Sequence, residues 1–239
     1  MGYKAEQRAG PSRILMHSAP MSTKSVLKVK CPACQEQFDA DFWTVVRGDR
    51  DRDLREMLIS GEFDLLICPK CSGMVACEET FIYLDPEKEL FVFVMPETYL
   101  KEKEKWLKKM RADYDTVKNS LLNMQNLCFE PICLFGAADL SALLLRDRDT
   151  EEETEVMEFI AAEKKFAAAK ISPSFARAHN LPFSLPYLGV SPSKDTALAA
   201  VKDILASNDA LLRVKNLCQI LERHETAEIG FVKRPQNAD

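Results

Sequence analysis

The sequence has few glycines, few histidines and no long apolar run, and these shortages exclude several kinds of protein. Only eight of the 239 residues are Gly, and there is no Gly-rich phosphate loop or nucleophile elbow, which argues against a nucleotide-binding cradle. No stretch of 18 apolar residues occurs, so a transmembrane helix is excluded. The His residues are scattered, and we interpret each as a solvent-exposed or loop residue: His17, His179 and His224.

The charge balance is acidic and argues against non-specific binding to nucleic acid or to an anionic membrane. The formal charge is -5 and the isoelectric point is about 5.4, which is the wrong sign for a surface that follows phosphates. One basic cluster is an exception, and we expect it to be the solvated face of a helix, with charge pairs one turn apart. It comprises Lys101, Lys103, Lys105, Lys108, Lys109 and Arg111.

Eight Cys in 239 residues are too few for a disulfide scaffold, but four of them form two similar turns. These turns are Cys31-Pro32-Ala33-Cys34 and Cys68-Pro69-Lys70-Cys71. In a chain without an export signal, paired Cys-x-x-Cys turns favour a metal over disulfides. Four thiolates fill the tetrahedral shell of Zn²⁺ and leave no position open for a substrate. The sequence therefore predicts one structural Zn²⁺ per chain, bound by Cys31, Cys34, Cys68 and Cys71.

Two other interpretations of these turns remain open: a pair of redox dithiols, and a site that has lost its metal. A redox Cys-x-x-Cys needs a helix N-terminus to depress the thiol pKa, whereas a β-type segment follows each turn here. Gly73 is expected to supply the positive φ of the second turn. Of the remaining cysteines, Cys77 and Cys218 are interpreted as small buried side chains, and Cys128 with Cys133 is a weak candidate for a second metal site.

Apolar alternation predicts a β module over residues 24–96. Strands are expected at residues 25–30, 37–46, 63–67, 74–84 and 90–95. A short helix is expected at 54–60, capped by Asp51 or Asp53 and ended by Gly61 in the left-handed conformation. Asp85 and Pro86 occupy the first two positions of a type I turn. The fold class is therefore α+β, with a zinc-ribbon-like β module followed by a mainly helical C-terminal part.

Helical periodicity dominates after Pro96. Residues 97–171 are predicted to continue the domain as helices, with one helix opening at Asp139 and another at a capping box that begins at Thr150. Residues 172–193 are rich in Pro and are predicted to be a linker. Residues 194–225 are expected to form C-terminal helices, capped by Ser193 and interrupted near Asn208. Residues 1–23 are expected to be a disordered leader and 226–239 a tail, and Met21 is an alternative start of the protein.

The helix that begins after Glu97 carries apolar residues at alternating spacings of three and four, which is the pattern of a coiled-coil-like seam. We expect this seam to pack on its own domain, and a homodimer through residues 107–124 is the alternative. The seam residues are Leu107, Met110, Tyr114, Val117, Leu121 and Met124.

With these residues in view, the chain resembles the CpXC-domain proteins, an uncharacterised and mostly bacterial family with two Cys-Pro-x-Cys motifs. The resemblance runs from about Val26 to Glu97, and more loosely over residues 132–158. Besides both Cys motifs it includes Ser60-Gly61-Glu62-Phe63, the Tyr83-Leu84-Asp85-Pro86-Glu87-Lys88 hairpin and Pro96. The chain differs at Gln35-Glu36, where many such turns carry Gly. The resemblance implies a zinc-binding module and adds no catalytic residue.

Taken together, the residues predict a cytoplasmic zinc-binding protein that acts as an interaction or scaffold module for a protein partner not yet known. We expect no catalytic residues and no membrane association. One alternative is a nucleic-acid or transcription-associated zinc ribbon that uses the basic cluster at 101–111. A second alternative is an enzyme with a site between the β module and the C-terminal helices, which requires a deep pocket with converging polar groups.

Overall fold

A mixed five-stranded sheet forms the centre of the protein. The computed structural model describes residues 21–63, 65–76, 78–120 and 129–223. The strand order is β1-β2-β5-β6-β7; β2 pairs in parallel with β5, and β6 with β7, while the other two pairings are antiparallel. The strands are β1 (Thr23–Lys30), β2 (Gln37–Arg47), β5 (Phe81–Asp85), β6 (Leu90–Met95) and β7 (Ile132–Phe135). Strands followed by helices confirm the α+β class.

Strand β6 is buried on both faces, and its alternation divides the interior into two cores. Leu90, Val92 and Val94 face α1 (Arg52–Ser60) and the first half of α3 (Ala137–Glu163). Phe91, Phe93 and Met95 face the opposite side. A central strand with apolar side chains on both faces is what a sheet covered by helices on both sides requires. The sheet therefore has a hydrophobic core on each of its faces, and these cores are formed without the C-terminal helices.

Helix α2 (Lys103–Ser120) covers the second face of the sheet, after the 3₁₀ turn η2 (Glu97–Glu102). Met110 and Tyr114 are buried in the core that also contains Phe91, and the rings of Phe91 and Tyr114 pack edge to face with their centroids 5.1 Å apart. This part of the predicted seam packs on the sheet of its own domain, as expected. Leu121 and Met124 lie outside the described residues.

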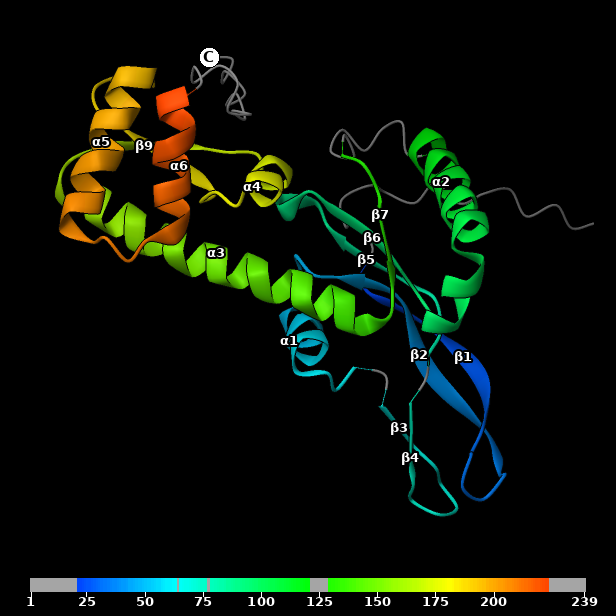
Figure 1. The fold of residues 1–239 in the computed structure, drawn as a ribbon. Helices are drawn as coiled ribbons and strands as arrows, with labels where there is room; N and C mark the ends of the chain where they lie inside the picture. Colours follow the sequence, from blue (N-terminus) through cyan, green and yellow to red (C-terminus); the bar gives the residue numbers. More distant parts are fainter. Residues whose placement is uncertain (1–20, 64, 77, 121–128, 224–239) are drawn as a thin grey trace, which may run out of the picture.

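A small lobe projects from one end of the sheet (Figure 1). It consists of the far ends of β1 and β2 and of the two-stranded sheet β3 (Leu65–Ile67) and β4 (Met74–Ala76). The expected strand at 74–84 is therefore two strands, β4 and β5, which belong to different sheets. Helix α1 ends as predicted, with Gly61 at φ 77°, but Asp51 at its N-cap position makes no side-chain cap hydrogen bond and Asp53 lies inside the first turn. The turn between β5 and β6 is η1 (Pro86–Lys88), where the Asp85 side chain accepts the Lys88 N–H.

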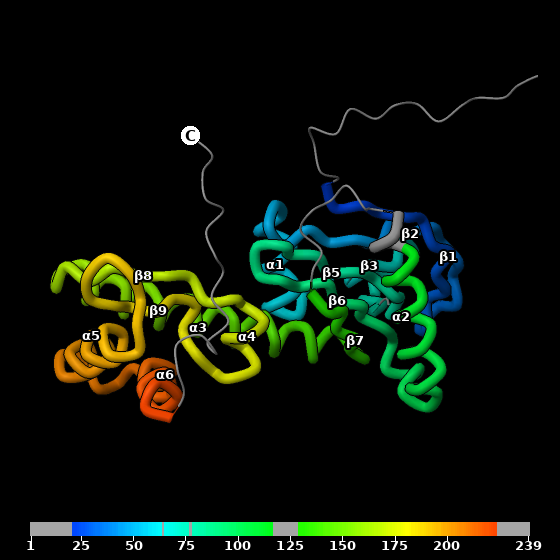
Figure 2. Tube along the Cα trace, turned by 90° about the horizontal axis from the view of Figure 1, so that it is seen from above, coloured from blue at the N-terminus to red at the C-terminus, as the bar shows by residue number. Residues whose placement is uncertain are grey.

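Helix α3 runs from the sheet to a separate C-terminal unit (Figures 1 and 2). That unit holds a two-stranded sheet, three helices and a core of its own, which includes Met157, Leu185, Ile204 and Leu217. Its elements are β8 (Ala167–Lys170), α4 (Pro173–His179), β9 (Ser184–Tyr187), α5 (Lys194–Ser207) and α6 (Leu212–Arg223). The Ser193 capping box and the break after α5 follow the sequence prediction.

Two predicted boundaries are wrong. The expected linker at 172–193 instead contains α4 and β9, and Leu181 and Leu185 within it are fully buried. Pro173 starts α4, and Pro186 lies in β9, a strand of a two-stranded sheet. Both positions tolerate Pro. The two helices expected around Asp139 and Thr150 are one helix of 27 residues. Thr150 does not cap it, because its hydroxyl donates to the Arg146 carbonyl one turn earlier at 2.7 Å.

Among the described residues, no helix combines the length and the apolar character that crossing a membrane requires.

Candidate metal centre and an adjoining cavity

The two Cys-Pro-x-Cys turns have the same backbone hydrogen bonds. In the first turn the Cys31 N–H donates to Glu36 O at 2.8 Å, and the Gln35 N–H donates to Cys31 O at 2.9 Å. In the second turn the N–H groups of Cys68 and Ser72 donate to Gly73 O and Cys68 O, both at 2.9 Å. The first turn joins β1 to β2 and the second joins β3 to β4. Two hairpins therefore present equivalent knuckles to each other.

The position after the second cysteine of each turn adopts the left-handed conformation. It is Gln35 in the first turn, with φ 64°, and Ser72 in the second, with φ 57°. Gly73 does not adopt a positive φ, so the prediction for that residue is wrong. A Cβ at Gly73 would lie 3.3 Å from the Cys71 sulfur, so the glycine leaves room for the thiol instead. In the first turn the Gln35 side-chain amide N–H donates to the backbone carbonyl of Pro32 at 3.1 Å. This bond stabilises a backbone conformation that Gln rarely adopts.

The four predicted ligands meet at one point. The Cys31 and Cys71 sulfurs are 3.7 Å apart, the Cys34 and Cys68 sulfurs are 3.6 Å apart, and all four lie within 4.8 Å of one another. Tetrahedral coordination with bonds of about 2.3 Å places sulfurs roughly 3.8 Å apart. None of the four is in a disulfide. The arrangement can therefore hold a metal ion.

The electrostatics of the cluster favour shared rather than independent ionisation of the thiols. The backbone N–H groups of Cys34 and Ala33 lower the pKa of Cys31 to about 7, with help from the neighbouring sulfurs and against the effect of burial. The Glu36 N–H acts to lower the pKa of Cys34, but burial and the other three sulfurs raise it to about 12. A metal ion bound here would displace the protons that remain on these thiols.

The lobe has little else to hold it together. Its core contains Cys31, Cys68 and Val75, with Val29, Cys34, Phe38 and Leu66 packed against them. A salt bridge of 2.8 Å joins Lys70 in one knuckle to Glu36 in the other, but both side chains are exposed, so it contributes little. Sulfur atoms therefore make up much of the interior at the point where the two hairpins meet.

The surroundings fit metal binding better than redox chemistry. Strands, not helices, follow both cysteine pairs, so no helix N-terminus is available to activate a thiolate. Cys133 lies half-buried on β7 and Cys218 half-buried on α6, and burial raises the pKa of both thiols. Cys77 and Cys128 lie outside the described residues, as do His17 and His224. His179 is exposed on α4 and its ring lies 4.3 Å from that of Phe175.

The basic cluster at 101–111 is partly paired with acids on the surface. Lys105 contacts Glu102 at 2.5 Å and Lys109 contacts Asp113 at 3.4 Å. Arg111 pairs with Glu130 and lies 3.6 Å from Asp115. These contacts agree with the expected solvated helix face.

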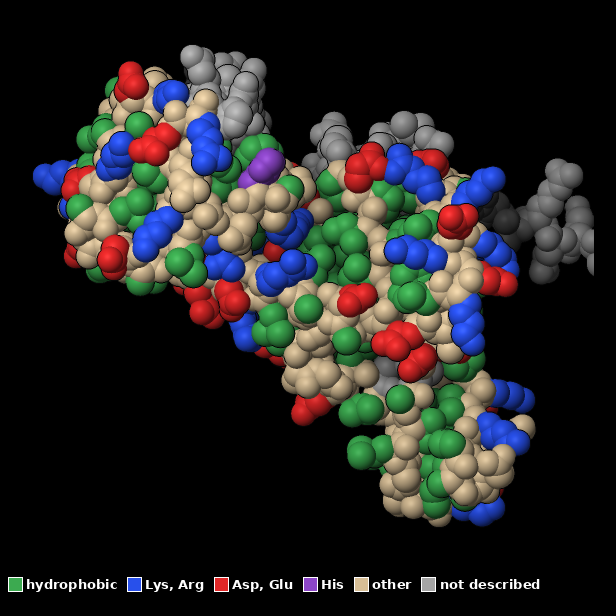
Figure 3. All heavy atoms as spheres, in the orientation of Figure 1, with side chains coloured by type: hydrophobic (Ala, Val, Ile, Leu, Met, Phe, Trp, Pro, Cys, Tyr) green, Lys and Arg blue, Asp and Glu red, His purple; other side chains and the backbone are tan. Residues whose placement is uncertain are grey.

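A cavity of about 1040 Å³ lies between the sheet and the C-terminal unit, at the place that the enzyme alternative requires. Hydrophobic side chains line a hollow between the two ends of the molecule, with Lys and Arg side chains beside it (Figure 3). The cavity walls include Phe129, Ile132, Leu143, Asp147, Arg146 and Arg177. Sequence reasoning missed Asp147, because Arg146-Asp147-Arg148-Asp149 has the appearance of an exposed charged stretch.

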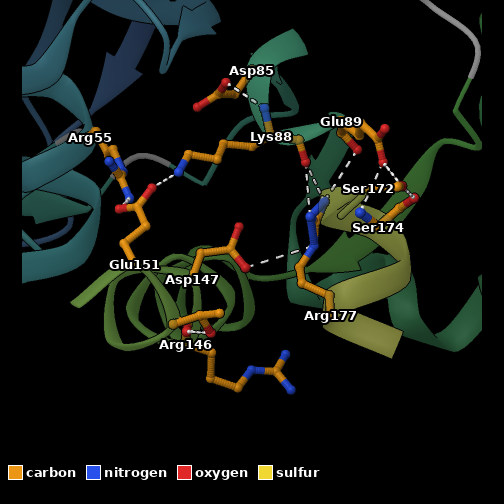
Figure 4. Close-up of polar contacts among 11 residues, drawn as sticks. Arg55, Asp85, Lys88, Glu89, Arg146, Asp147, Glu151, Ser172, Ser174 and Arg177 are labelled. Carbon is orange, nitrogen blue, oxygen red and sulfur yellow. Dashed lines mark hydrogen bonds and ion pairs between the residues drawn. The ribbon is translucent and has the colours of Figure 1, made fainter. Parts of the chain in front are cut away.

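A connected group of charged side chains lies beside this cavity (Figure 4). Arg55 contacts Glu151 at 3.2 Å, and Lys88 pairs with the same carboxylate. Arg177 donates to Lys88 O at 2.9 Å, and its Nε lies 3.8 Å from Asp147 Oδ1. Burial raises the pKa of Asp147 against the opposing effect of Arg177. These contacts join the β5–β6 turn to α3 and α4, and so fix the C-terminal unit against the sheet.

The family model described as CpXC protein matches residues 29–144, a range that contains both knuckles and ends within the first half of α3. No curated protein and no solved structure matches the chain.

Proposed function

We propose that the chain, whose residues 29–144 match the CpXC family model, belongs to that family and binds one structural Zn²⁺ through Cys31, Cys34, Cys68 and Cys71. The observation that carries the proposal is the approach of four sulfurs to within 4.8 Å from two hairpins. Zinc suits four thiolates in tetrahedral geometry, and four protein ligands leave no position for a substrate. The ion links the β1–β2 hairpin to the β3–β4 hairpin and stabilises a lobe with a small apolar core.

Cobalt substitution tests the ligand set. Metal-free protein is titrated with Co²⁺, and the visible absorption is compared for the wild type, Cys71→Ser and the control Cys218→Ser. We expect the intense d–d bands and the sulfur-to-metal charge transfer of tetrahedral four-thiolate cobalt at one equivalent, weakened and shifted in Cys71→Ser only. An unchanged spectrum in Cys71→Ser would overturn the ligand assignment.

We further propose that the lobe acts as an interaction module for a protein partner with an apolar surface. On β3 and β4 the inward side chains Leu66 and Val75 pack near the cysteines, while the outward ones are exposed. Ile67 and Met74 are paired across the two strands and are 68% and 76% exposed. Leu65 is 47% exposed on the same face. A contiguous apolar face on a small projecting sheet is a feature of binding surfaces.

A photo-cross-linking residue at Ala76, which is exposed and pairs with Leu65 across this face, tests the interaction. The captured protein is purified, and its affinity is measured for the wild type, for Ile67→Ser/Met74→Ser and for Leu100→Ser, an exposed apolar position elsewhere. We expect the double variant to lose at least about tenfold in affinity while keeping its metal, and Leu100→Ser to match the wild type. Equal affinity in all three would contradict the proposed surface, as would the absence of any cross-linked protein.

A further inference from the structure

Asp147 is a buried carboxylate without a hydrogen-bond donor among the described residues. The residue is 1% exposed, and neither carboxylate oxygen accepts a hydrogen bond within the described part of the chain. Its nearest cationic contact, Arg177 Nε at 3.8 Å, is beyond hydrogen-bond length. Native proteins rarely leave a buried charge in this state, and such a group has a structural or functional explanation.

Asp147 lies among charged side chains, but its carboxylate has one distant cationic neighbour in that group. Figure 4 shows the Asp147 side chain projecting from α3 between Lys88 and Arg177, while the Arg146 guanidinium points away. Three further carboxylates lie in this group: Asp85, Glu89 and Glu151. Glu151 pairs with Arg55 and Lys88, so within this group only Arg177 comes within 4 Å of the Asp147 carboxylate.

The other acids of this group already have donors, and Asp147 does not. The Glu89 carboxylate accepts the Ser172 hydroxyl at 2.6 Å and the Ser174 N–H at 2.9 Å. The Asp85 carboxylate accepts the Lys88 N–H at 3.1 Å. An additional cation would therefore be directed to Asp147.

The adjoining cavity has the size and the walls of a small-molecule site. Its volume of about 1040 Å³ is at the upper end of the range typical of ligand pockets. Phe129, Ile132 and Leu143 supply apolar wall, and Asp147 with Arg177 supplies the polar end. The combination suits a ligand with an apolar body and one charged nitrogen group.

We propose that this cavity binds a small organic cation, an amine, amidine or guanidine on an apolar body, whose N–H groups donate to Asp147. The ligand would supply the hydrogen-bond donors that both Asp147 carboxylate oxygens lack. The apolar body would lie on Phe129, Ile132 and Leu143. The proposal stands independently of the metal centre and of the interaction surface on the lobe.

Three ring compounds of the same shape test the proposal on wild-type protein: benzamidine, benzamide and benzoate, which are cationic, neutral and anionic. Calorimetric titration at low ionic strength should show benzamidine binding at least about tenfold more tightly than benzamide, as expected for a hydrogen bond between charged groups. Tighter binding of benzoate, or equal binding of benzamidine and benzamide, would overturn the proposal. This comparison needs no variant.

Variants then locate the site. Asp147→Asn should lose the preference for benzamidine over benzamide, while Asp149→Asn, the same change at an exposed position of α3, should keep it. Near-ultraviolet circular dichroism of both variants verifies that the fold is intact. Retention of the full preference in Asp147→Asn would overturn the assignment of Asp147 as the ligand's partner.

Discussion

The sulfur of Cys34 lies 3.6 Å from the sulfur of Cys68, although 34 positions of sequence separate the two residues. The two sulfurs meet because the two hairpins have equivalent backbone turns. Each turn places its two thiols at the same point in space. A metal ion there would close the lobe as a cross-link between segments that share few other contacts. The effect of such a cross-link on stability and on amide hydrogen exchange can be measured.

Removal of the metal should loosen the lobe and spare the C-terminal unit. The C-terminal core around Ile204 and Leu217 contains no residue of the lobe, so its stability should not depend on the thiolates. After treatment with a zinc chelator, we expect amide hydrogen exchange to accelerate in residues 26–38 and 65–75. Exchange in α5 and α6 should stay slow. A uniform acceleration along the chain would contradict a local role for the metal.

The knuckles could be predicted from sequence because their information is local. A Cys-Pro-x-Cys turn needs only neighbouring residues, and the repetition of that turn identifies the partner. The backbone conformation of the turn could not be predicted from the sequence. Gly73 was expected to have a positive φ, but Gln35 and Ser72 adopt the left-handed conformation instead. The two turns share their hydrogen bonds, and these bonds decide which position must have a positive φ.

The long-range parts of the fold could not be predicted. Residues 132–135 form an edge strand whose parallel partner, β6, lies some 40 positions earlier, and no local pattern specifies that pairing. The prolines at 173–186 suggested a linker, whereas Leu181 and Leu185 are fully buried. Asp147 gave no signal, because an acid among alternating charges resembles a solvated one until the tertiary structure covers it.

Gly48→Ala should destabilise the protein, because a Cβ at this position would lie 1.9 Å from the Tyr83 hydroxyl oxygen. The Tyr83 ring is fully buried and cannot swing away without disturbing the core between the sheet and α3. We expect a loss of about 1–3 kcal/mol in the free energy of unfolding, measured by urea denaturation. Adding Tyr83→Phe should recover part of that loss, since it removes the closest atom. Equal stability of Gly48→Ala and the wild type would contradict this packing.

Glu153→Ala should destabilise the C-terminal unit. The Glu153 carboxylate accepts the backbone N–H groups of Arg213 at 2.5 Å and Val214 at 3.2 Å, and pairs with the Arg213 guanidinium at 2.9 Å. These N–H groups belong to the second and third residues of α6, which have no acceptor within the helix, so the carboxylate anchors its N-terminus. We expect a loss of about 2 kcal/mol in the free energy of unfolding. Glu155→Ala, at an exposed position, should lose less than about 0.5 kcal/mol.

Asp147 should make the protein less stable as the pH rises through the acidic range. Burial raises the pKa of this carboxyl in the folded state, so the folded protein holds the proton more tightly than the unfolded chain does. Stability from this group is complete below the unfolded pKa of about 3.9 and is lost as the pH rises through the higher folded value. Asp147→Asn should therefore raise the melting temperature at pH 7, with the advantage closing toward pH 3.5. A lower melting temperature at pH 7 would mean that Arg177 stabilises the charge fully.

Metal content per chain is the most direct test of the central claim, that four cysteines form one structural metal site. The wild type, Cys68→Ser and Cys218→Ser are purified without added metal, and zinc is measured against protein concentration together with the melting temperature. The account predicts about one zinc per chain in the wild type and in Cys218→Ser, and loss of both zinc and thermal stability in Cys68→Ser. Wild-type protein without metal, whose thiols cycle between reduced and disulfide forms, would contradict it and make redox chemistry the better explanation.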